Sequence, residues 1–152
     1  ELQELVSVEE QFTDALRQMA DAASHPSLKK ALTHHRGETQ AQAQRLLSIL
    51  QRHGAKARAH TDQAMECLIN ETKKMLAMLK GDDIRDAGLI ASVLKLKHYE
   101  IAAYGTAAAL AGQLDLRDEQ RMLHESLEEE KKTDALLTKL AKTEVNQDAL
   151  AA

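Results

Sequence analysis

The chain has 152 residues, 24 acidic and 20 basic side chains, a net charge of -4 and 2% aromatic residues. This length suits one domain with a real core. The mild negative charge and scattered basic residues argue against nucleic acid or an anionic membrane as a partner. No stretch approaches the roughly 20 apolar residues that span a bilayer. The single cysteine, Cys67, excludes an internal disulfide framework, suits a reducing compartment such as the cytoplasm, and is expected in the core.

Apolar residues recur at helical spacing along most of the chain, and no stretch shows the alternation of a strand, which predicts an all-α fold. Helices are expected over residues 1–23, 26–53, 61–79, 83–111 and from 115 or 118 to 142. Pro26 suits the first turn of the second helix, and Gly54 suits its end. Thr61 or Asp62 is the expected cap of the third helix.

Short turns join the first two helices and the last two, so each pair is predicted to form an antiparallel hairpin. Asp115 or Asp118 is expected to cap the final helix. A connection of about thirty residues, which holds the short third helix, lets the second and fourth helices run in the same direction. This is the plan of a ferritin-like four-helix bundle. Residues 1–142 are expected to form this single domain, and residues 143–152 a polar, frayed tail.

Each of the four long helices carries a carboxylate near the middle of its apolar stripe. These residues are Glu9, Glu38, Glu100 and Glu130. At about 1.5 Å per residue from the hairpin turns, all four fall within about one helical turn of the middle of the bundle. A carboxylate is costly to bury unless a partner pairs with it or a metal binds it. We therefore expect these side chains to converge on a metal site.

Further candidates lie on the same helix faces. Asp134 and Gln42 each follow the central glutamate of their helix by four residues, so each can reach the same centre. His35 is a candidate metal ligand, a donor that orients Glu38, or a plain core histidine. Tyr104 either hydrogen-bonds a ligand carboxylate or only packs in the core. The oxygen-rich set favours iron or manganese over a thiolate-type zinc site.

Lys97 lies on the inner face of the fourth helix, one turn before Glu100. Its ammonium group can neutralise carboxylates without any metal, which would make the centre a purely structural network. Alternatively, Lys97 reaches out of the bundle or pairs with one surplus carboxylate beside a bound metal. Four or five acids against one lysine still leave a net negative charge, which favours a bound cation.

With these residues identified, the chain resembles the YciE/YciF family of bacterial ferritin-like proteins along nearly all its length. The most specific block is the His98–Thr106 segment of the fourth helix. The other segments that carry the resemblance are Ser7–Gln11, His35–Gln42, Arg85–Ile90 and Glu129–Asp134.

The resemblance implies a ferritin-like four-helix bundle with an extra crossover helix, a homodimer, and a role in bacterial stress responses. The acidic pattern of the family carries over to Glu9, Glu38, Glu100, Glu130 and Asp134. This chain departs from the pattern at Lys97 and Gly37, where the family usually has acidic residues. Only the first departure lies on the inner stripe.

Two functions follow as alternatives. The first is an oxidoreductase-like protein with two iron or manganese ions that acts on oxygen or peroxide. The second is a stress protein, metal-free or with a purely structural metal, that works through its dimer surface. The small residues between Gly105 and Gly112 allow close helix contact, either inside the bundle or across a dimer. Iron storage is a weaker third alternative, because nothing in the sequence indicates a cage.

Overall fold

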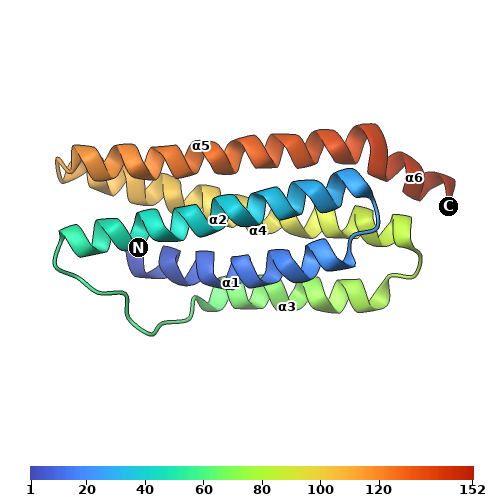
Figure 1. Ribbon diagram of the computed structural model, residues 1–152, viewed down its shortest axis with the longest axis horizontal. Coiled ribbons are helices and arrows are strands. Elements are labelled where there is room, and N and C mark those ends of the chain that lie inside the picture. Colours follow the sequence, from blue (N-terminus) through green and yellow to red (C-terminus); the bar gives the residue numbers. More distant parts are fainter.

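The computed structural model describes residues 1–152, which form helices and the turns between them. Five long helices lie along one axis (Figure 1). They are α1 (Leu2–Ala22), α2 (Pro26–Arg52), α3 (Gln63–Met78), α4 (Asp82–Gln113) and α5 (Arg117–Leu140). The prediction of an all-α fold is confirmed. None of the helices combines the length and the apolar composition that a bilayer-spanning segment requires.

The helices α1 and α2 form one antiparallel hairpin, and α4 and α5 form another (Figure 1). The connection between the hairpins holds α3, which packs against α4 and α1. Because α3 carries the chain back along the bundle, α2 and α4 run in the same direction, as the length of the connection predicts. This arrangement brings α1, α2, α4 and α5 together around one interior.

Local chemistry accounts for the helix ends. Pro26 occupies the first turn of α2, and Gly54 follows this helix with a positive φ of 66°, which glycine adopts without strain. The Asp62 side chain caps α3 by accepting from the Met65 amide at 2.7 Å. By contrast, neither expected aspartate caps α5: Leu116 holds the cap position, and no side chain bonds to the end of that helix.

A buried carboxylate fastens the turn between α1 and α2. Asp86, in the first part of α4, accepts hydrogen bonds from the backbone amides of Ser24 at 3.0 Å and His25 at 2.6 Å. These two amides have no helical partner, because the chain leaves one helix there and enters the next. Asp86 therefore ties the end of the first hairpin to the start of the second.

The apolar core consists of two clusters. On each long helix of the two hairpins, the residues of the first cluster and those of the second occupy separate stretches. On α4 the first cluster ends at Leu96 and the second begins at Tyr104, and on α5 the second ends at Leu127 and the first resumes at Leu137. On α2, α4 and α5 the intervening residues include Glu38, Glu100 and Glu130, which therefore lie between two dry layers, whereas Glu9 of α1 lies within the stretch of the first cluster.

Two further expectations differ from the structure. Cys67 is exposed, because the buried face of α3 is formed by Met65, Ile69 and Thr72, and Cys67 projects from another side of the helix. The expected frayed tail is instead helical: a π-helical segment (Ala141–Val145) continues α5 into α6 (Asn146–Ala151). Val145 is buried in the first apolar cluster and holds this segment against the bundle.

Candidate metal centre

Four helices each bring one ligand-type side chain into the middle of the bundle. Glu9 comes from α1, His35 from α2, Glu100 from α4 and Glu130 from α5, and all four are almost completely buried. Ligating atoms of the last three lie within 4.8 Å of one another. A group of this kind can hold a metal ion.

The side chain of Lys97 lies among these same three residues. Its Nζ atom is 2.6 Å from His35 Nε2 and 3.0 Å from Glu100 Oε2, and it also contacts Glu130 Oε2. The contacts with His35 and Glu100 are hydrogen bonds, and the contact with Glu130 is an ion pair. Burial lowers the pKa of Lys97, while the charge and hydrogen bond of Glu100 oppose that shift.

The contacts of His35 require the neutral tautomer with its proton on Nδ1. Its Nδ1 atom is 3.2 Å from Glu38 Oε2 and donates to it, which leaves Nε2 to accept from Lys97. Burial, with the charge of Lys97, lowers the pKa of His35 to about 4, so the ring is neutral near pH 7. The ring meets Phe12 edge to face at 5.6 Å between centroids. His35 thus orients Glu38, one of the roles expected from the sequence, with the pattern of a metal-ligating histidine.

Tyr104 lies on the other side of Glu100 and donates a short hydrogen bond to Glu9 Oε1. Burial raises the pKa of Glu9 well above its usual value, and the charge of Glu100 adds to the shift. Burial also raises the pKa of Glu100, although Lys97 opposes it. The phenol therefore bonds a candidate ligand as well as filling the core.

Several buried acceptor atoms at the centre have no hydrogen-bond donor. They are Glu9 Oε2, Glu100 Oε1, Gln42 Oε1 and both carboxylate oxygens of Glu130, of which Oε2 forms only the ion pair with Lys97. Fewer than about one buried polar group in ten lacks a partner in folded proteins, so five in one place require an explanation. Either a cation or protons must compensate these oxygens.

Glu38 and Asp134 lie at the edge of the centre and are partly exposed, with about a quarter of each side chain accessible. Glu38 accepts from Thr133 at 3.1 Å and from His35, and these hydrogen bonds hold its pKa below the usual value. Asp134 pairs with His98 at 3.4 Å. The structure therefore does not bring all the predicted acids into one dry cluster: it buries three and leaves these two beside water.

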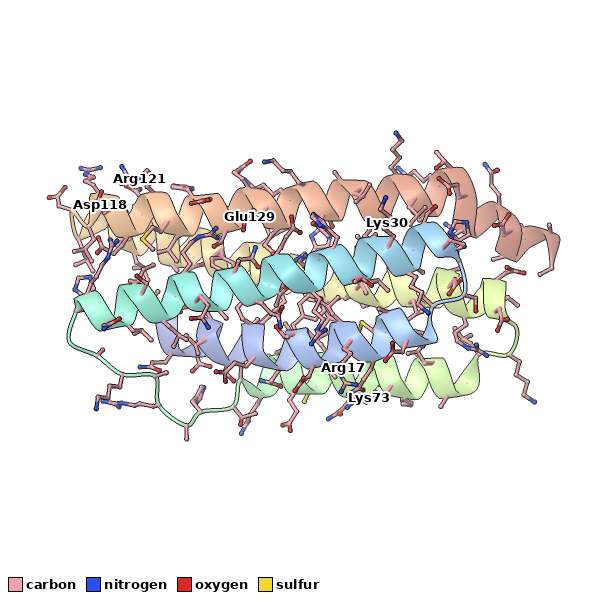
Figure 2. The ribbon with its side chains drawn as sticks, in the orientation of Figure 1. Arg17, Lys30, Lys73, Asp118, Arg121 and Glu129 are labelled. Carbon is pink, nitrogen blue, oxygen red and sulfur yellow. The ribbon has the colours of Figure 1, made fainter.

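A charged pair next to the centre is not predicted by the sequence. Arg45 binds both carboxylate oxygens of Glu129, at 3.0 and 3.1 Å, and donates to Ser126 at 2.6 Å. Gln42 donates to the same carboxylate at 2.9 Å. Glu129 lies midway along α5, where this helix faces α2 (Figure 2). The one sequence signal for this pair is the position of Arg45, which is three residues after Gln42 and so shares a helix face with it.

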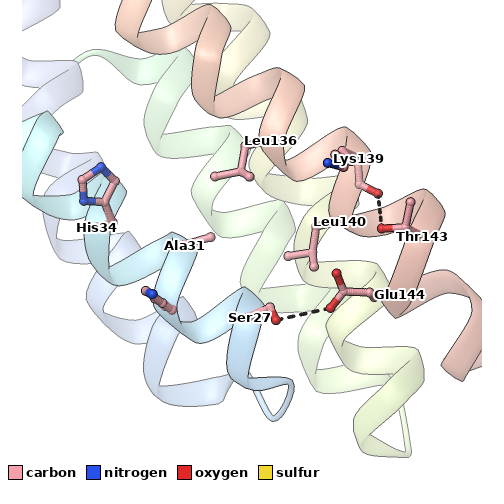
Figure 3. A pocket seen from close by; sticks show the side chains of 9 residues that line it. Ser27, Ala31, His34, Leu136, Lys139, Leu140, Thr143 and Glu144 are labelled. Atoms are coloured by element: carbon pink, nitrogen blue, oxygen red, sulfur yellow. Dashed lines mark hydrogen bonds between the residues drawn. The ribbon is translucent and has the colours of Figure 1, made fainter.

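The two largest grooves lie away from the centre. One, of about 370 Å³, runs between the start of α2 and the end of α5 (Figure 3). Its lining includes Lys30, His34 and Lys139, and Ser27 donates to Glu144 at 3.3 Å across it. The other, also about 370 Å³, is mostly apolar and lies near Leu114 at the opposite end of the bundle. Neither is lined by Lys97 or by any of the four central ligand-type residues.

Comparisons with known proteins agree on one family. Residues 1–150 match the family model described as a domain of unknown function, DUF892. The chain is 41% identical over 149 residues to protein YciF of Escherichia coli (strain K12), which covers 97% of this chain and 90% of that protein.

Two solved structures resemble the chain closely. The crystal structure of the E. coli stress protein YciF superposes with a TM-score of 0.90 at 41% identity and covers 95% of this chain and 92% of that one. YcfI of Rhodopseudomonas palustris, described as a candidate structural protein, has a TM-score of 0.87 at 34% identity, with coverage of 90% and 87%. The resemblance predicted from the sequence is confirmed: this chain belongs to the DUF892 family, with YciF among its relatives.

Proposed function

We propose that this chain is a ferritin-like four-helix-bundle protein of the bacterial stress response that binds one divalent metal ion, iron or manganese, at its acidic centre. The similarity to the E. coli stress protein supports the physiological setting. The parallel course of α2 and α4 supports the ferritin-like plan. The single cysteine agrees with a reducing compartment, and we place the protein in the cytoplasm.

The charge balance of the centre carries the metal proposal. Three carboxylates, Glu9, Glu100 and Glu130, are completely buried there, and Lys97 is the one cation among them. Three negative charges less one positive charge leave two, which equals the charge of one divalent ion. An uncompensated buried charge costs several kcal/mol, of the order of 3–5 when a pair is broken. A bound ion would remove this cost.

The donor set fits a hard ion. Glu9 Oε2, Glu100 Oε1 and Glu130 Oε1 are buried oxygens without a hydrogen-bond donor, and carboxylate oxygens suit iron(II) or manganese(II). We propose these three residues as ligands, and Gln42 Oε1, which also lacks a donor, as a neutral candidate. Glu9 lies outside the group of ligating atoms within 4.8 Å of one another, so an ion would have to draw its carboxylate toward Glu100 and Glu130. Tyr104, which donates to the other oxygen of Glu9, would hold that carboxylate in place. When bound, iron or manganese would supply redox chemistry toward oxygen or peroxide.

The alternative function is a metal-free structural stress protein. Its specific support is that burial raises the pKa of both Glu9 and Glu100, so that protons could neutralise these carboxylates instead of an ion. In this alternative, the protein would act through its surface. We propose a homodimer in either case, because α4 presents the exposed small residues Thr106 and Ala109 beside the exposed Leu110. Analytical ultracentrifugation tests the dimer.

The test of the proposed function is the manganese and iron content of the purified chain after reconstitution without oxygen and removal of loosely bound ions. The proposal predicts one ion per chain, lost in a Glu9→Gln variant. Glu10→Gln is the matched control, because Glu10 is adjacent in sequence but exposed, and it should keep the ion. Absence of a bound ion from the wild-type protein would favour the metal-free alternative, and one ion in both the wild-type protein and Glu9→Gln would exclude Glu9 as a ligand. Added iron(II) and oxygen would then show whether an absorption band develops in the wild-type protein alone.

A further inference from the structure

The contacts of Lys97 have the form of a metal coordination shell. The residues whose ligating atoms cluster most closely are His35, Glu100 and Glu130, and they are the same three that contact Lys97 Nζ. His35 turns its free Nε2 lone pair toward the ammonium group and donates its Nδ1 proton to Glu38. Histidines bound to metal ions use this same division between the two ring nitrogens.

The Lys97 side chain is completely enclosed and does not reach out of the bundle. It is 0% exposed, and its Nζ atom lies 5.5 Å from the centre of the Phe12 ring, which belongs to the dry layer next to the centre. Two hydrogen bonds, to His35 and Glu100, and an ion pair with Glu130 surround the ammonium group inside the bundle. A metal ion and this ammonium group cannot both occupy the space between the three acceptors.

We infer that the ammonium group of Lys97 is a built-in replacement for one ion of a two-ion carboxylate centre, so that this chain binds one ion where an acidic residue at position 97 would allow two. The inference rests on the proposed function for the remaining ion. It excludes chemistry that needs two adjacent ions in this chain. It also means that the half of the centre nearest His35 keeps its positive charge when no metal is available.

The charge count makes the inference quantitative. With Lys97→Glu, four buried carboxylates would face one another, and their four negative charges equal two divalent ions. Lys97→Gln has the shape of Lys97→Glu without the added charge or the second carboxylate oxygen. Both variants remove the ammonium group, and only Lys97→Glu adds a carboxylate ligand. Comparing them therefore separates the effect of the new ligand from the effect of removing the ammonium group.

The experiment measures Mn(II) bound per chain, by elemental analysis and by titration calorimetry, for the wild-type protein and both variants. All are refolded with Mn(II) and checked by circular dichroism. We expect one ion in the wild-type protein and two in Lys97→Glu. We expect Lys97→Gln to bind any second ion at least tenfold more weakly than Lys97→Glu. Electron paramagnetic resonance should show an isolated Mn(II) ion in the wild-type protein and two coupled ions in Lys97→Glu.

Failure of this inference is distinct from failure of the proposed function. Two coupled ions in the wild-type protein would overturn the inference, even if Lys97→Glu did not fold. A folded Lys97→Glu that binds no more Mn(II) than the wild-type protein would also overturn it. If the wild-type protein binds no ion and Lys97→Glu gains one, the proposed function fails, whereas the replacement of an ion by lysine stands.

Discussion

Replacement of Lys97 by methionine should strongly destabilise the metal-free protein. Methionine has a similar length and can fill the space beside Phe12, so the packing changes little. The loss is electrostatic: Glu100 and Glu130 lose their shared cation, and His35 Nε2 loses its donor. Removing one partner of a buried ion pair costs about 3–5 kcal/mol, because the other charge stays buried without compensation.

The measurement is thermal unfolding at pH 7 with EDTA present, followed by circular dichroism. For a domain of about this size, a loss of 1 kcal/mol lowers Tm by roughly 2–4 °C, so Lys97→Met should lower Tm by roughly 6–20 °C. The matched control is Lys95→Met, two residues away on the exposed side of α4, which should change stability by less than about 0.5 kcal/mol. Adding Glu130→Gln to Lys97→Met should recover about 1–3 kcal/mol, because it removes one of the stranded charges.

Equal effects of Lys97→Met and Lys95→Met would refute this reasoning. That result would mean that the ammonium group does not compensate the carboxylates in the interior. An additive effect of Glu130→Gln would exclude the Lys97–Glu130 pair specifically.

Three further predictions concern pH and local structure. Because the pKa of His35 falls from 6.5 to about 4 on folding, the unfolded chain binds a proton that the folded chain refuses between these values, and stability should fall by about 3 kcal/mol as pH drops through that window. The difference in the free energy of unfolding between the wild-type protein and His35→Gln should therefore shrink as the pH falls through the same window. Asp62→Ala should cost about 1–3 kcal/mol, because it removes the cap of α3 and the partner that Tyr99 holds at 2.7 Å. Cys67 should react with a thiol reagent in the folded protein as fast as in urea, since it is exposed.

Each of these predictions has its own contradicting outcome. A difference between the wild-type protein and His35→Gln that is constant from pH 7 to pH 4 would mean that His35 titrates normally. The control for Asp62 is the exposed Asp83 in the first turn of α4, and equal costs for the two alanine variants would exclude a special role for the cap. Slow labelling of Cys67 without urea would place the thiol in the core after all.

Helical periodicity and turn residues predicted most of the fold. Pro26 marks a helix start because its missing N–H is not needed in the first turn, and the glycine at position 54 marks a helix end because its positive φ suits glycine. Asp62 was identifiable as a cap because its side chain can accept from a free amide at the start of a helix. Leu116 at the cap of α5 was not predictable from propensity, because tertiary packing overrides the preference for aspartate there.

The depth of the acids was predictable, but their partners were not. Counting residues from the hairpin turns indicated that all four glutamates lie at the middle of the bundle, and three of them are buried there. Glu38 is held at the edge because His35 and Thr133 both donate to its Oε2 atom, and such contacts depend on rotamers and on a neighbouring helix. The orientation of Lys97 has the same origin: a long side chain on an inner face can reach into the core or out of it.

The most direct test of the central claim is a crystal structure of the wild-type chain reconstituted with Mn(II), with anomalous scattering to locate the ion. The account predicts one anomalous peak per chain, bounded by Glu9, Glu100 and Glu130, with Lys97 Nζ still beside His35. Two peaks would contradict it, and so would a single peak between His35 and Glu130 with the lysine displaced. If no anomalous peak appears after treatment with Mn(II), protons and Lys97 alone neutralise the carboxylates of the centre.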